Sequence, residues 1–223
     1  MKTKIIVAAS ATASLILGGL LGVQQYISSQ ITSGVEREMP KASGISVSIP
    51  FADVLGNITS DSIKSVHINI ESFALKENGI KTSLDISASN IGKAKPNLVE
   101  SLEVTATIPA STITESSEFD NAQIVGNTLQ VSTGADGLGT ASLIPKHSDN
   151  QIYFELQIVS ILGNEIPASS LPADLQNQIK SKSQVSLTLP NGLKIDSVSL
   201  SNKGLSVKMS GSHIQLGDLG SSL

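Results

Sequence analysis

The sequence predicts a mainly β protein with a few helices, of the α+β class. The main observation is that apolar and polar side chains alternate strictly in several segments, including 66–71, 80–88 and 152–158. Side chains at positions i and i+2 share a face of a strand, so each of these segments is apolar on one side only. A second observation is that turn-forming residues recur at short intervals, as they do in antiparallel sheets. A one-sided sheet must bury its apolar side against another layer.

Segments of this kind follow one another through most of the chain. The predicted strands are Ile45–Ile49, Ile63–Ser72, Ile80–Ser89, Leu102–Ile108, Thr128–Thr133, Thr140–Ile144, Ile152–Val159, Val185–Leu189, Leu193–Leu200 and Leu205–Met209. The pairs Asn78-Gly79 and Asn191-Gly192 suit hairpin turns that need positive φ. The alternation slips near Asp196-Ser197, which predicts a β-bulge and a bend in that strand.

Three short segments are predicted to be helical. Residues 51–58 place apolar side chains at i, i+3, i+4 and i+7, which lie on one face of a helix. Residues 110–119 follow a proline and offer Ser111 as an N-cap. Residues 172–180 have a proline in the first turn, where its missing N–H costs nothing.

The N-terminus predicts a membrane-targeting segment. Lys2 and Lys4 precede an uncharged, largely apolar stretch from Ile5 to Val23, close to the roughly 20 residues that span a bilayer. No convincing cleavage site follows it, which favours an uncleaved anchor over a removed signal peptide. The positive charge places the N-terminus in the cytoplasm and the rest of the chain outside.

The predicted organisation therefore has four parts. They are a signal anchor at 1–23, a helix or stalk at 24–43, a β domain at 44–217 and a tail at 218–223.

Composition argues against several functions. A net charge of −4 disfavours a nucleic-acid partner, which would need a basic stripe. The chain has no Cys, and His67, His147 and His213 are far apart in sequence, so we expect no metal site and no cofactor. No GxSxG sequence is present, and the glycine-rich segment 134–139 lacks the Lys-Ser/Thr ending of a phosphate loop. The sequence thus predicts a protein that is not an enzyme.

Three segments share their order and spacing with a known family. The first is Ile45-Ser-Val-Ser-Ile-Pro-Phe-Ala-Asp-Val-Leu55-Gly56, which the strand Ile63–Ile70 follows. The others are Leu189-Pro-Asn-Gly-Leu-Lys-Ile-Asp-Ser-Val198 and Gly204-Leu-Ser-Val-Lys-Met-Ser-Gly211. Over most of residues 24–216 the chain resembles the LmeA-type phospholipid-binding family of actinobacterial cell envelopes. It departs from the family pattern at Ile49 and Ala52.

The resemblance implies a fold similar to the tubular lipid-binding domains of the bactericidal/permeability-increasing protein type. There a long, curved antiparallel sheet wraps a helix and leaves an apolar groove. It also implies non-catalytic binding or carriage of phospholipid, or of a lipid-linked envelope precursor, at the outer face of the cytoplasmic membrane in support of envelope assembly.

The candidate lipid-binding residues are apolar side chains of the predicted strands and of the short helix. They are Phe51, Leu55, Ile58, Val66, Ile68, Leu84, Ile86, Val104, Ile108, Phe154, Leu156 and Ile158. Each of them has ordinary core as its alternative interpretation, and the short-helix residues Phe51, Leu55 and Ile58 are the strongest candidates. The lysines that could meet a head-group phosphate, or simply be solvated, are Lys64, Lys76, Lys81, Lys93 and Lys95.

Two other functions stay open on the sequence alone. One is a structural or adhesive envelope protein whose β core is fully packed and holds no ligand. The other is an esterase acting on envelope lipids, which has less support because no nucleophile motif is present.

Overall fold

The structure is a computed structural model, and it covers the globular part of the chain with several gaps. It describes residues 32, 36, 42–50, 60–74, 81–92, 98–116, 121–133, 138–187, 189 and 191–215. The predicted anchor, the predicted helix 51–58 and the predicted tail lie outside these residues. Of the predicted stalk helix, Thr32 and Glu36 are described, and both are helical. Within the described residues, no helix combines the length and apolarity needed to span a bilayer.

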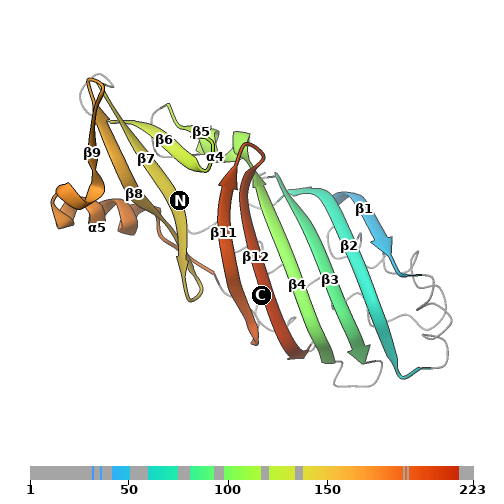
Figure 1. Cartoon of the computed structure of the whole chain (residues 1–223). Helices are drawn as coiled ribbons and strands as arrows, with labels where there is room; N and C mark the ends of the chain where they lie inside the picture. The colour runs from blue at the N-terminus through green and yellow to red at the C-terminus, as the bar shows by residue number, and fades with distance from the viewer. Residues whose placement is uncertain are drawn as a thin grey trace.

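The strands form two six-stranded antiparallel sheets, here named sheet A and sheet B (Figure 1). Sheet A has the order β1 (Ala42–Ser48), β2 (Ser62–Ala74), β3 (Lys81–Gly92), β4 (Leu98–Pro109), β12 (Gly204–Gln215) and β11 (Leu193–Ser201). Sheet B has the order β10 (Val185–Ser186), β8 (Gln151–Ile161), β7 (Gly139–Ser148), β6 (Thr128–Thr133) and β5 (Gln123–Val125), with β9 (Asn164–Pro167) also paired to β8. The prediction of a mainly β protein with few helices is confirmed.

Two sheets take the place of the one long sheet that was predicted. The chain leaves sheet A at Pro109, which has no N–H to extend a ladder, and enters helix α4 (Ala110–Ser116) before it starts sheet B at β5. The alternation in the sequence is equally one-sided in both sheets. It therefore cannot distinguish one sheet from two.

The described helices lie at the edges of the sheets. Helix α4 confirms the helix predicted from residue 110, and α5 (Ala173–Ser183) confirms the one predicted from residue 172. A short 3-10 turn, η3 (Ala168–Ser170), precedes α5. The short strands β5 and β9 were not predicted. The predicted bulge is confirmed, because the pairing of β11 with β12 shifts between Ile195 and Ser197.

A second irregularity crosses sheet A near one end. The pairing of β3, β4 and β12 places Asn90, Glu100 and His213 side by side, and Asn90 and His213 have positive φ values of 49 and 55. The Asn90 side-chain amide donates a hydrogen bond to the Glu100 carboxylate at 2.5 Å. Asn and His tolerate this left-handed backbone better than most residues. At this irregularity the alternation of inward and outward side chains shifts by one residue. Ile91 and Val99 therefore lie on the apolar side of the sheet.

A shared core joins the two sheets. Strand β11 packs against β7, β6 and β5. Sheet A contributes Ile108, Leu200 and Leu205 to this core, and sheet B contributes residues that include Leu143 and Leu156. In the opposite direction, Ile152 of β8 is part of the core of sheet A. The two sheets therefore fold as one packed unit.

Gly204, at the start of β12, allows β4 and β12 to approach each other closely. Its φ is +130, and a Cβ atom there would overlap the backbone oxygen of Ile108. We predict that Gly204→Ala lowers the free energy of unfolding by about 2–4 kcal/mol, because it combines an unfavourable backbone conformation with a backbone clash. Chemical denaturation monitored by circular dichroism measures this loss.

Gly126→Ala is the matched control. Gly126 also has positive φ, at +62, but a Cβ atom there would meet nothing within 4 Å. Its substitution should cost only about 1 kcal/mol. Equal losses for the two variants would contradict the close approach of β12 to β4.

Candidate functional site

The pairing register of sheet A arranges its aliphatic side chains in rows on one face. The residues of one row are each buried or partly buried and lie on six neighbouring strands: Val47, Ile68, Ile86, Val104, Met209 and Ile195. The next row consists of Ile45, Ile70, Leu84, Ala106, Val207 and Val198. The face contains no charged residue in either row. It is a broad, continuous aliphatic surface.

Six of the predicted lipid-binding residues lie on this aliphatic face of sheet A. They are Val66, Ile68, Leu84, Ile86, Val104 and Ile108, and all six are buried. Ile108 also belongs to the core that joins the sheets. The register thus brings together side chains that the sequence places on three separate strands.

The other candidates are not on this face. Phe154, Leu156 and Ile158 lie on β8 in sheet B, where Leu156 is buried, Phe154 is partly buried and Ile158 is 37% exposed. Phe51, Leu55 and Ile58 lie outside the described residues.

The candidate list also left out side chains that the structure places on the aliphatic face. Val207 and Met209 are buried there beside Ala106 and Val104. Their alternation with polar residues was visible in the sequence and predicted a strand. The missing information was that β12 pairs with β4, which only the fold supplies.

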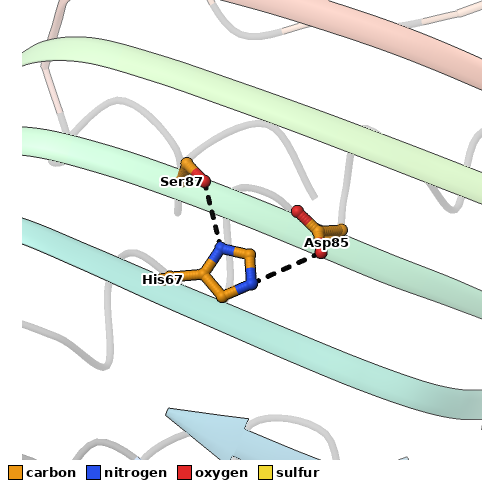
Figure 2. A network of polar contacts seen from close by, with 3 residues as sticks. All are labelled: His67, Asp85 and Ser87. Carbon is orange, nitrogen blue, oxygen red and sulfur yellow. Dashed lines mark hydrogen bonds and ion pairs between the residues drawn. The ribbon is translucent and has the colours of Figure 1, made fainter. Parts of the chain in front are cut away.

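The opposite face of sheet A is polar and holds a small network (Figure 2). The His67 Nδ1 atom lies 3.1 Å from the Ser87 hydroxyl, and its Nε2 atom lies 3.4 Å from the Asp85 carboxylate. His67 on β2 is paired directly with Ser87 on β3. The side chains of His67 and Asp85 are 45% and 48% exposed. His67 is therefore a surface residue, as expected, but it has two partners.

A cavity of about 320 Å³ lies beside this network on the polar face. Its lining combines polar residues, which include Ser65, His67, Ser87 and Glu103, with Pro50, Val66 and Ala88. The lining is therefore mixed in character and does not by itself select a polar molecule over an acyl chain.

The Ser87–His67–Asp85 grouping resembles a hydrolytic triad only in its residue types. A serine hydrolase needs backbone N–H groups aimed at the developing oxyanion. Ser87 lies within β3, which is paired on both sides, with β2 and with β4. The N–H groups around Ser87 are therefore engaged in the sheet ladder and do not form an oxyanion hole.

The comparisons with known proteins identify a family. A model of the LmeA-like phospholipid-binding family matches residues 17–210, which is most of the chain. The chain belongs to the LmeA-like family. Neither the curated proteins nor the solved structures gave a match. The matched range includes sheet B and nearly all of sheet A.

Thr82 is a buried polar residue on the aliphatic face of this LmeA-like protein. Its side chain is only 3% exposed, and its hydroxyl has no hydrogen-bond partner. The register that pairs Ser83 with Thr107 places Thr82 beside Ile108, near the core that joins the sheets. A buried hydroxyl without a partner lowers stability because it has lost its hydrogen bonds to water.

The structure does not bring the candidate head-group lysines together. Lys64 and Lys81 are both exposed, but they lie at opposite ends of the ladder between β2 and β3. Lys76, Lys93 and Lys95 lie outside the described residues. Among the residues that the structure describes, no group of three or more His, Cys, Asp or Glu side chains could hold a metal ion.

We predict that Thr82→Val stabilises the lipid-free protein by about 1 kcal/mol. Valine keeps the shape of the side chain and removes the hydroxyl that has no partner. Thr107→Val, on the opposite face of the neighbouring strand, is the control and should change stability by less than about 0.5 kcal/mol. Chemical denaturation of the full chain measures both. A loss of stability in Thr82→Val would show that the hydroxyl makes a favourable interaction.

Proposed function

We propose that the protein binds or carries phospholipid, or a related envelope lipid, against the aliphatic face of sheet A, and that it is not an enzyme. Membership of the LmeA-like phospholipid-binding family is the observation that carries this proposal. The chemistry of the face supports it, since its rows contain only aliphatic side chains, Met209 and small residues. Acyl chains are flexible hydrocarbons, and such a surface matches them without specific polar contacts.

The free energy of a phospholipid bound to the protein has to be compared with that of the same lipid in a bilayer. A phospholipid with two acyl chains buries about 30 methylenes, worth roughly 0.8 kcal/mol each relative to water. The same lipid gains nearly as much in a membrane. The protein therefore needs only to match the membrane, and proximity to the bilayer raises the chance of exchange.

We further propose that the protein works at the outer face of the cytoplasmic membrane and supports assembly of the cell envelope. The motivation is the N-terminal sequence, in which Lys2 and Lys4 precede the apolar stretch from Ile5 to Val23. An anchor there would keep the lipid-binding face close to its source of lipid.

A structural or adhesive envelope protein is the second candidate. The close packing of the aliphatic face favours it, because Ile70, Ile86 and Val99 are 0% exposed. In that case the interior of sheet A is full and has no space for an acyl chain. The two functions predict different effects of a larger side chain on the aliphatic face: reduced lipid binding in the first case and reduced stability in the second.

We predict that Ala106→Leu reduces the amount of phospholipid bound, because the larger side chain occupies space on the aliphatic face. Ala106 is 2% exposed in the middle of its row. The full chain, freed of lipid and reloaded with phosphatidylethanolamine, is measured by native mass spectrometry. Thr105→Leu, on the polar face of the same strand, should bind as much lipid as the wild type.

The same experiment decides between the two candidates. No lipid on the wild-type chain, together with a loss of about 1–3 kcal/mol in Ala106→Leu, would favour the fully packed structural protein.

We predict that the purified full chain releases no fatty acid from phospholipid in mixed micelles. Wild type, His67→Ala and Ser87→Ala should all give the background rate measured by a free-fatty-acid assay. The physical reason is that the backbone N–H groups around Ser87 are engaged in the ladders with β2 and β4. Fatty-acid release that is lost in both variants would instead support the esterase.

A further inference from the structure

Three large aliphatic side chains are exposed together at one end of sheet B. The exposed fractions of Leu138, Ile161 and Leu162 are 59%, 45% and 75%. The Leu162 N–H donates a hydrogen bond to the Leu138 carbonyl at 3.3 Å, and Gly139 is paired with Ile161. These residues thus form one patch, here named the apolar tip. In Figure 1 the β8–β9 hairpin projects at the outer end of sheet B, away from sheet A.

The backbone of the apolar tip is unfavourable for leucine. Ile161 pairs with Asn164, so Leu162 and Gly163 are the two central residues of a tight hairpin turn. Their φ values are 52 and 83, as in a type I′ turn, which prefers Asn-Gly. The other described non-glycine residues with positive φ are of the types that tolerate this conformation: Asn90, Asn121, Asp149 and His213.

Leu162 is therefore a residue that neither the turn nor the solvent favours. Asparagine would fit the backbone better and would be well hydrated. A strained and exposed apolar residue at a protruding turn is the kind of outlier that indicates contact with another surface.

We propose that the apolar tip inserts into the surface of a phospholipid bilayer, from which the protein exchanges lipid. This inference rests on the proposed function, because a lipid-binding protein must meet the bilayer that holds its ligand. Residues 138–140 and 158–164 contain no charged side chain, and Asp136 lies two residues before Leu138. Shallow insertion of Leu138, Ile161 and Leu162 themselves therefore removes water from apolar groups only. The nearest charged residue on β9 is Glu165, and no Lys or Arg lies in these segments. Apolar contact drives the insertion, and neutral phosphatidylcholine suffices.

The absence of tryptophan from the chain permits a direct test. Leu162→Trp in the full chain places a single fluorophore on the apolar tip. It should lose most of its emission with phosphatidylcholine vesicles whose acyl chains are brominated, relative to unbrominated vesicles. The control is Val125→Trp, because Val125 is 47% exposed and lies on the edge strand β5, at the end of β6 that points away from the apolar tip. Its emission should not change.

A second variant separates this proposal from the proposed function. Leu162→Asn should raise the melting temperature but slow lipid uptake from phosphatidylcholine vesicles about tenfold, since a buried leucine is worth at least that factor. Uptake of the same lipid delivered by cyclodextrin should be unchanged.

Each outcome of these experiments has a distinct meaning. Failure of the wild-type chain to take up lipid from cyclodextrin would overturn the proposed function. Normal cyclodextrin loading, combined with an unquenched Trp at position 162 or unchanged vesicle uptake by Leu162→Asn, would overturn the apolar tip alone. If the emission of that Trp instead shifts to shorter wavelength at high protein concentration without vesicles, the apolar tip contacts a second copy of the chain. That result would overturn its insertion into the bilayer.

Discussion

In two rows across sheet A, apolar side chains lie beside one another on all six strands, and this cross-strand register separates the two faces of the sheet. Because side chains alternate with a period of two, a slip of one residue would move Ile68 and Ile86 into water and His67 and Asp85 into the interior. The bulge near Ile195 and the left-handed residues Asn90 and His213 do not disturb the apolar face. The proposed binding of lipid at this face depends on this separation.

The two faces of sheet A offer different chemistry. One is a continuous aliphatic surface with Thr82 as the buried polar side chain among the described residues. The other displays hydroxyl groups, the His67 network and the cavity beside that network. The low number of aromatic residues means that the aliphatic face is formed mainly by the branched side chains of Ile and Val. Acyl chains need such a surface, whereas specificity for a head group would need polar groups at its rim.

Sheet B extends the molecule and shares its core with sheet A through β11. At its outer end, Leu162 is exposed to solvent and occupies a turn position that prefers asparagine, so the residue is unfavourable for local stability. Natural sequences depart from local preferences mainly where function requires it. A rigid connection between the two sheets would place the aliphatic face at a fixed position relative to the outer end of sheet B.

The sequence by itself determined the long strands and their inward and outward faces, the helices α4 and α5, the bulge near Ile195 and the family resemblance, but not the short strands β5 and β9. These features are local, since alternation, turn residues and capping act over a few neighbouring residues. Only the tertiary structure decided that there are two sheets, that β12 lies beside β4, and that Phe154 and Leu156 are in a different sheet from Ile86. It also decided that Thr82 is buried and Leu162 exposed. Pairing between strands far apart in sequence depends on the packing of the whole chain, and a one-sided strand carries no information about its neighbours.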